Sequence, residues 1–113
     1  MEKEMNGYVY ILGDRNNDGI YKIGVTRGNV ETRIKKLQTG NAGEIYLVKS
    51  HESHCPFFVE RMFHKKYQFK NVMNEWFELT IDDLNNFELD CSKFEKLNDI
   101  NEEIKKNMSV ETY

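Results

Sequence analysis

Five side chains in this sequence have types and spacings that suit chemistry. Tyr10 and Lys22 stand in two short apolar segments, and Arg33 follows Lys22 by eleven residues. Glu60 and His64 are four residues apart, so on a helix they lie on the same face. Cationic donors and a hydroxyl group bind anions, and a carboxylate beside an imidazole binds metals or transfers protons. Each residue alone has an ordinary structural explanation, and only their combination indicates a functional site.

A β-hairpin is expected to bring the first two of these residues together. Residues 8–12 and 20–26 are rich in apolar, aromatic and β-branched types, and the loop between them consists almost entirely of turn-forming residues. Side chains alternate between the two faces of a strand, so Lys22 and Gly24 share one face. The pattern predicts that Tyr10 and Lys22 meet across the hairpin.

A helix is expected to follow the hairpin and to present Arg33. Val30, Ile34 and Leu37 recur at the spacing of one helix face, and Asn29 is a suitable N-cap. Arg33 lies at the edge of this apolar stripe. We therefore expect its guanidinium group to reach the open face of the hairpin.

The sequence pattern in the middle of the chain predicts one more strand, one more helix and one extended segment. Residues 44–50 alternate as a third strand, and Pro56 suits the first turn of a helix that runs to about Phe69. Residues 75–79 read as a short strand or extended segment. The element order predicts an α+β fold, namely a small antiparallel three-stranded sheet flanked by helices, with extra C-terminal helices.

Two C-terminal helices are expected after this segment. Thr80 is a suitable cap for a helix over residues 81–87, and Ser92 with Glu95 fits a capping box that opens a helix to about Lys106. The apolar residues of the second helix recur on one side, which predicts an inward face formed by Phe94, Leu97, Ile100 and Ile104.

Length and composition are those of one small domain. The chain has 113 residues, enough to bury a hydrophobic core without stabilising disulfides or metal ions. No stretch approaches the roughly 20 apolar residues of a membrane span, so no membrane association is expected. Residues 1–4 lack the core of a signal peptide. Cys55 and Cys91 do not make a disulfide framework, so we expect an intracellular, reducing location.

The charge distribution divides the chain into two parts. The net charge of −3 argues by itself against a nucleic-acid-binding protein. The acidic excess lies in residues 80–113, however, whereas residues 1–79 are mildly basic. Local clusters matter more for phosphate contact than the total charge. We therefore expect a functional domain over residues 1–79 and an acidic helical extension, residues 80–113, packed on the same domain.

The order of these motifs resembles that of the GIY-YIG nuclease superfamily. Tyr8-Val9-Tyr10 stands at the first motif and Lys22-Ile23-Gly24 at the second, followed by a helix with an arginine and a later helix with a glutamate. The similarity is greatest to a phage and large-virus branch whose second motif reads K-I-G-x-T. That branch also has an R-x-x-x-L helix, an E-x-x-x-H helix and a closing E-W-F or E-F-F element, which match residues 33–37, 60–64 and 75–77. The resemblance covers about residues 7–79.

The resemblance implies hydrolysis of a DNA phosphodiester with one divalent metal. Glu60 would hold the metal, Mg²⁺ or Mn²⁺, which suits carboxylate oxygens and water. Arg33 would donate to the non-bridging phosphate oxygens as charge builds up. Tyr10 would orient or deprotonate the attacking water. Its free pKa is about 10, and Lys22 with the metal would lower that pKa.

Two departures from the best-known members leave an alternative open. Lys22 replaces the second-motif tyrosine, and Leu37 stands where those members often have a histidine. His64 either supplies the missing imidazole, as metal ligand or proton relay, or is an ordinary half-buried helix residue. If lysine does not substitute for tyrosine, the chain is a catalytically inactive GIY-YIG-like regulator that binds nucleic acid or protein.

Contacts with partners are expected from three regions. The basic residues that flank the site in sequence would touch the DNA backbone: Arg15, Arg27, Lys35, Lys36, Arg61, Lys65, Lys66 and Lys70. No segment resembles a base-reading module, so low intrinsic sequence specificity is expected. Trp76 and Phe77 are expected in the core, with base stacking as the alternative. The C-terminal helices either cap the sheet or present a face for a homodimer or a protein partner.

Overall fold

Five strands form one antiparallel sheet in the order β3-β1-β2-β5-β4. The computed structural model describes residues 5–111. The strands are β1 (Gly7–Asp14), β2 (Ile20–Thr26), β3 (Ile45–Ser53), β4 (Asn71–Met73) and β5 (Trp76–Glu78). The predicted α+β class is confirmed. The expectation of three strands is wrong, because β4 and β5 add a short hairpin to the edge of β2.

Strand β4 has little sequence signal of its own, whereas β5 lies within the short strand or extended segment predicted over residues 75–79. All three residues of β4 are exposed, so the strand shows no alternation of buried and exposed positions. Asn74, in the turn, has a φ of 51°, in the left-handed region that asparagine tolerates better than most residues. Pairing with β5 therefore defines β4, and that pairing depends on the position of β2.

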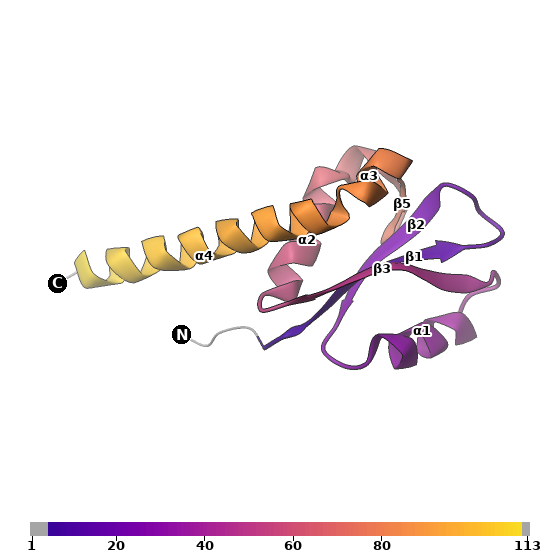
Figure 1. The fold of residues 1–113 in the computed structure, drawn as a ribbon, viewed down its shortest axis with the longest axis horizontal. Coiled ribbons are helices and arrows are strands. Elements are labelled where there is room, and N and C mark those ends of the chain that lie inside the picture. Colours follow the sequence, from indigo (N-terminus) through magenta and orange to yellow (C-terminus); the bar gives the residue numbers. More distant parts are fainter. Residues whose placement is uncertain (1–4, 112–113) are drawn as a thin grey trace.

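Helices cover both faces of the sheet (Figure 1). On one face lies α1 (Val30–Thr39), and on the other lie α2 (Pro56–Lys66), α3 (Ile81–Asn85) and the first part of α4 (Phe87–Glu111). A 3-10 turn, η1 (Gln68–Lys70), links α2 to β4. Among residues 5–111, no helix combines the length and the apolar character that a membrane crossing requires.

Three predicted helix starts are confirmed. The Asn29 side chain accepts a hydrogen bond from the backbone N–H of Thr32 at 3.0 Å. Pro56 occupies the first turn of α2, and Thr80 forms a capping box with Asp83. The Asn29 and Thr80 side chains accept hydrogen bonds from backbone N–H groups that have no acceptor inside the helix, and Pro56 has no N–H group that needs one. Local chemistry is therefore sufficient to begin α1, α2 and α3.

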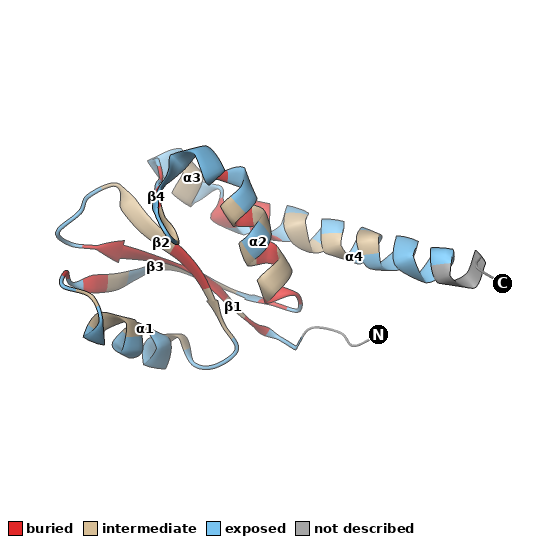
Figure 2. Cartoon of the chain, turned by 180° about the vertical axis from the view of Figure 1, so that it is seen from behind, coloured by how far each residue is buried: buried red, intermediate tan, exposed pale blue. Residues whose placement is uncertain are grey.

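The two faces of the sheet bury separate apolar clusters, and Figure 2 shows the buried residues along β1 in red. On the α1 face, Tyr10, Leu12 and Ile45 form the smaller cluster, with the apolar stripe of α1 packed against it. On the opposite face the larger cluster is built around Phe63, whose ring centroid lies 5.3 Å from that of Phe87. Cys55 and Cys91, both buried, belong to this second cluster.

The predicted capping box at Ser92 is wrong. The helix α4 already begins at Phe87, so Ser92 lies inside it. Phe87 and Cys91 are fully buried against α2, and this packing continues the helix through the position at which a local signal would begin it. Tertiary contact overrides the capping pattern here, and the helix extends to Glu111 instead of about Lys106.

The C-terminal half of α4 extends away from the sheet (Figure 1), which gives the molecule a longest dimension of 57 Å. The predicted inward face is only partly confirmed. Phe94 packs edge-on against Phe63, whereas Leu97, Ile100 and Ile104 are 38%, 50% and 50% exposed. Polar side-chain contacts join the earlier part of α4 to β3 and to the residue that follows it: Lys49–Glu88, His51–Glu95 and His54–Asp99. Association of this helix with a second copy or a protein partner stays a prediction.

Candidate active site

Tyr10 and Arg33 meet between the sheet and α1. The tyrosine is 1% exposed, and its hydroxyl oxygen accepts a hydrogen bond from Nε of Arg33 at 3.4 Å. This bond raises the pKa of Arg33 above its ordinary value, because the bond favours the protonated guanidinium. Only one of its five N–H donors is directed at Tyr10, so the exposed side chain keeps donors for an anion.

Gly24 makes room for this tyrosine. It lies directly opposite Tyr10 in the β1–β2 pair, as the predicted hairpin requires. A Cβ atom at position 24 would lie 2.5 Å from the hydroxyl oxygen of Tyr10 and 2.6 Å from its ring carbons. Glycine is therefore required for the tyrosine ring to cross β2 and reach α1.

The pKa of Tyr10 is raised, not lowered as the sequence led us to expect. Burial is the main cause, and the negative charges of Glu75 and Glu60 add to it, while Arg33 opposes it. The neutral phenol is therefore favoured at physiological pH. A phenol accepts from Arg33 and still has one O–H to donate. The water-activating role of Tyr10 stays a prediction, and orientation by hydrogen bonding suits its protonation better than deprotonation does.

Lys22 lies beside an acidic residue that sequence reasoning did not assign to the site. Its Nζ is 3.3 Å from Oε1 of Glu75 and 5.8 Å from the ring centroid of Trp76. Glu75 also acts electrostatically on Tyr10, Arg33 and Glu60. Its only signal in the sequence was its place at the start of the E-W-F element, just before β5.

Glu60 and His64 reach the site from α2, on the other face of the sheet. His64 donates from Nε2 to the backbone carbonyl of Ile23 at 3.0 Å, since a carbonyl can only accept. Its Nε2 lies 3.9 Å from Oε2 of Glu60, which is too long for a hydrogen bond. Because Nε2 bears a proton in this arrangement, that nitrogen cannot be a metal ligand. The predicted roles of His64 as metal ligand or proton relay are restricted to Nδ1.

The edge of β2 explains how groups from both faces converge. Short β5 pairs with β2 only over residues 20–22. Beyond that point the backbone N–H of Ile23 donates to the carbonyl of Glu75 at 3.1 Å, and its carbonyl accepts from His64. Within residues 5–111 no strand pairs with this stretch of β2 on its β5 side, so α2 side chains approach from one face of the sheet and Lys22 and Tyr10 from the other.

The pKa of the Glu60 carboxyl group is raised above its ordinary value. Burial is the main cause that raises its pKa, and Glu75 contributes in the same direction, while the positive charges of His64, Arg61 and Lys22 oppose it. Among the described residues, no group of three or more His, Cys, Asp or Glu side chains could hold a metal. A hard cation such as Mg²⁺ needs only one or two carboxylates, with water and phosphate oxygens completing the shell. The described residues therefore do not make a closed structural metal site, and an ion held by Glu60 would need water and phosphate oxygens to complete its shell.

The eight basic residues predicted to touch DNA fall into two groups. Three are paired with acidic side chains: Arg15 with Glu44 at 2.8 Å, Lys66 with Asp90 at 2.5 Å and Lys70 with Asp83 at 2.6 Å. In the part of the chain that the structure describes, the other five have no acidic side chain within 4.0 Å: Arg27, Lys35, Lys36, Arg61 and Lys65. The second group is the better candidate for phosphate contact.

Replacing Gly24 with alanine should destabilise the protein by about 1–3 kcal/mol, the usual cost of overpacking. The new methyl group would overlap the ring of Tyr10, which is fully buried between the sheet and α1. Urea denaturation of the two proteins measures the difference. Gly28→Ala is the matched control, because a Cβ there would have only Thr26 Oγ1 within reach, at 3.8 Å. Equal stability of the two variants would contradict the close packing of Tyr10 on Gly24.

Comparison with known proteins gave one match. The family model described as T5orf172 domain, a phage-associated domain, matches residues 7–98. The matched region contains all five strands, the three complete helices α1–α3 and the first half of α4. It therefore runs past residue 79, where the sequence resemblance ended. Searches of curated proteins and of solved structures found no match.

Proposed function

The chain belongs to the T5orf172 domain family, and on this basis we propose that it is a metal-dependent DNA endonuclease of the GIY-YIG type. The observation that carries the proposal is the hydrogen bond from Arg33 to the hydroxyl of Tyr10, a group on which Glu60 also acts electrostatically. The charge of Glu60 raises the pKa of that hydroxyl. An arginine, a hydroxyl and a desolvated carboxylate at one edge of a sheet suit a phosphodiester better than a neutral substrate.

Glu60 is the proposed metal ligand. A divalent ion, Mg²⁺ or Mn²⁺, would polarise the phosphate and stabilise the leaving oxygen when bound. Burial makes the ionised carboxylate unfavourable in the absence of a cation, and Glu75 adds to this effect. Both features favour capture of a cation at this position.

Arg33 is the proposed phosphate clamp. Its Nε is held by Tyr10, which aims the planar group, and the terminal N–H groups are left for two non-bridging oxygens. Tyr10 would donate its O–H to the attacking water or to a phosphate oxygen, and so orient the nucleophile without giving up its proton. His64, tied to β2 through Ile23, would position Glu60 and not bind the metal through Nε2.

Lys22 is the proposed electrostatic assistant. Its ammonium group opposes the rise in the pKa of Glu60 and is itself held by Glu75. This position corresponds to the second-motif tyrosine of the best-known GIY-YIG members. A lysine there stabilises negative charge on a phosphate but does not orient a water molecule as a phenol does.

The experiment that tests this function is a gel assay of supercoiled plasmid and branched DNA with Mg²⁺ or Mn²⁺. We expect nicked or linear products that disappear in EDTA, with little preference for sequence, because no base-reading module is evident. The control is the same protein after heat denaturation, which excludes a contaminating nuclease that survives heating. Absence of cleavage in every metal would contradict the enzyme.

The second candidate is a catalytically inactive regulator that binds nucleic acid or protein. The observation that favours it is the ion pair of Lys22 with Glu75, which neutralises the lysine at the position where an active member has a tyrosine. A wild-type protein that shifts DNA on a gel in Mg²⁺ and leaves it intact would support this candidate. A protein that neither shifts nor cuts DNA would direct attention to the exposed face of α4 and a protein partner.

A further inference from the structure

A groove opens beside the candidate active site on the α1 face. It has a volume of about 260 Å³. Lys22 and Trp76 line one part of it, Lys36, Leu37 and Gly40 line another, and Asn41 and Ile45 complete the wall. Lys22 is common to the groove and to the active site. Lys22 therefore connects the groove to the candidate active site.

The two aromatic residues of β5 have different environments. Phe77 is 2% exposed and belongs to the large cluster under α2. Trp76 points to the opposite face, is only half-buried and belongs to neither apolar cluster. The expectation of core packing is confirmed for Phe77 and is wrong for Trp76, because strand alternation sends the indole towards the groove.

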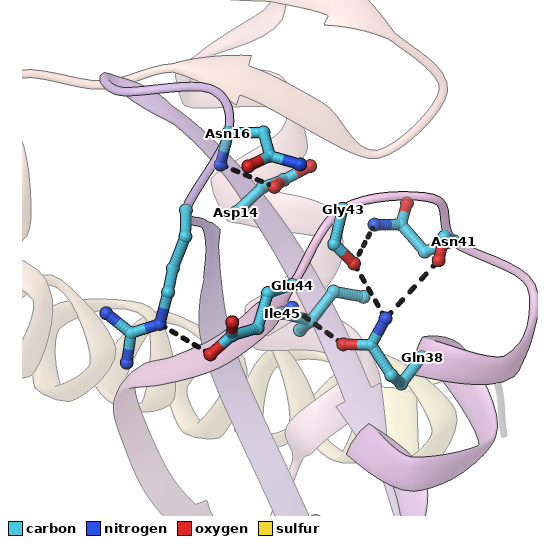
Figure 3. Close-up of polar contacts among 8 residues, drawn as sticks. Asp14, Asn16, Gln38, Asn41, Gly43, Glu44 and Ile45 are labelled. Carbon is cyan, nitrogen blue, oxygen red and sulfur yellow. Dashed lines mark hydrogen bonds and ion pairs between the residues drawn. The ribbon is translucent and has the colours of Figure 1, made fainter.

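The far wall of the groove is held in one shape by Gln38 (Figure 3). Its amide nitrogen donates to the carbonyl of Gly43 at 2.6 Å and to that of Asn41 at 3.3 Å, and its amide oxygen accepts from the backbone N–H of Ile45 at 2.7 Å. The Asn41 side chain also donates to the carbonyl of Gly43, at 3.2 Å. The loop between α1 and β3 is thus fixed before any ligand arrives, which lowers the entropy lost on binding.

The lining has the chemistry of a nucleotide site. Proteins bind unpaired bases on an aromatic side chain while nearby lysines contact the phosphates. Here an indole and two lysines, Lys22 and Lys36, face one groove, with Leu37 and Ile45 as apolar floor. The volume of about 260 Å³ is below the roughly 300–1,000 Å³ of sites for drug-sized ligands, so the groove has room for one base and not for a base pair.

We propose that this groove binds a single unpaired nucleotide of a DNA strand, with its base against Trp76 and its phosphates at Lys22 and Lys36. The inference deepens the proposed function, on which it rests, by naming its substrate class: DNA in which a nucleotide next to the cut phosphate is unpaired. A paired base inside a duplex is covered on both faces and must leave the stack before it can meet a side chain. Flaps, junctions and single strands present such a nucleotide directly.

Trp76 is the only tryptophan in the chain, so it reports on the groove directly. Its fluorescence should change saturably when a short single-stranded DNA is added in EDTA, where no cleavage occurs. A blunt duplex of the same sequence should produce at most a small change. Equal changes with both DNAs, or none with the single strand, would overturn the inference.

Affinity measurements on variants give a second, independent readout. Trp76→Ala should weaken binding of a labelled single strand about 5- to 150-fold by fluorescence anisotropy, the range for loss of one stacked base. The same variant should bind a strand of abasic nucleotides as well as wild type does, because no base remains to stack. Phe69→Ala is the matched control, since Phe69 is an aromatic side chain that is 95% exposed and does not line the groove. Equal losses for the normal and the abasic strand would overturn the inference, as would equal losses for the two variants.

These measurements separate the groove from the nuclease activity. A protein that binds the single strand through Trp76 but cuts no DNA would support the groove and contradict the enzyme. A protein that cuts plasmid DNA while Trp76→Ala binds every DNA like wild type would support the enzyme and overturn the groove.

Discussion

Arg33→Ala should lower DNA cleavage at least about 10²- to 10³-fold, the loss typical of removing one preorganised donor to a developing oxyanion. The arginine is exposed, and its contact with the protein core is one hydrogen bond of 3.4 Å to Tyr10. Loss of its charge and its planar donors should therefore affect the phosphate far more than the fold. Single-turnover cleavage rates at saturating DNA measure the effect.

Two matched variants separate geometry from charge. Lys35→Ala removes an exposed cation from the same helix, and we expect less than a tenfold change, in line with a contact that is lost from one phosphate. Arg33→Lys keeps the charge and loses the planar donors, so it should stay severely impaired. If Arg33→Ala lowered the Tm strongly and kept normal cleavage, the residue would be structural and the clamp would be disproved.

Glu60→Gln should abolish metal-dependent cleavage and at the same time stabilise the apo protein near neutral pH. Glutamine has nearly the shape of glutamate and no charge, so it loses the metal ligand and relieves the burial of a carboxylate. The expected loss of activity is at least about 10²-fold, because the metal's stabilisation of phosphate charge goes with it. Plasmid cleavage in Mn²⁺ and thermal melts with and without Mn²⁺ provide the two measurements.

The sign of the stability effect follows from the raised pKa of Glu60. Because the folded state binds this proton more tightly than the unfolded state, the group adds stability below its unfolded pKa of about 4.3. That contribution is lost as the pH rises through the raised folded pKa. At pH 7 the wild type lacks it, so the Tm of Glu60→Gln should exceed that of wild type in EDTA, and the gap should shrink on acidification.

Bound metal is expected to raise the Tm of wild type alone, and so to reverse the order of the two Tm values. Mn²⁺ should raise the Tm of wild type and leave that of Glu60→Gln unchanged, since only the folded carboxylate binds the ion. Glu52→Gln, which changes an exposed carboxylate on β3, is the matched control and should respond to Mn²⁺ like wild type. A variant that still gained stability from Mn²⁺ would show that another group holds the metal.

Much of the site could be predicted because it depends on local pattern. The hairpin alternation places Tyr10 opposite Gly24, and the apolar stripe of α1 brings Arg33 over the same face. The i, i+4 spacing puts Glu60 and His64 together on α2. Each of these relations is set by strand or helix periodicity within one or two elements, so the sequence alone was sufficient.

Other parts of the site depended on long-range contacts. The carbonyl of Ile23 accepts from His64, forty-one residues away, and this bond makes Nε2 of His64 a donor. Glu75 joins the site because β5 pairs with β2 and ends there. Burial between the sheet and α1 raised the pKa of Tyr10, whereas the expected effect of Lys22 and a bound metal was to lower it.

The sequence by itself therefore determined where α1 to α3 begin, the hairpin, and which side chains face the same way. The predicted ends of α2 at about Phe69 and of α3 at about Phe87 are wrong, because these helices end at Lys66 and Asn85. Only the tertiary structure decided that β4 and β5 extend the sheet, that α4 begins at Phe87, and that Trp76 faces a groove while Phe77 enters the core. The physical reason is the range of the interactions. Periodicity and capping act over a few residues and can be recognised in the sequence. Burial, edge pairing of strands and the electrostatics of Glu60 depend on which residues distant in sequence pack together.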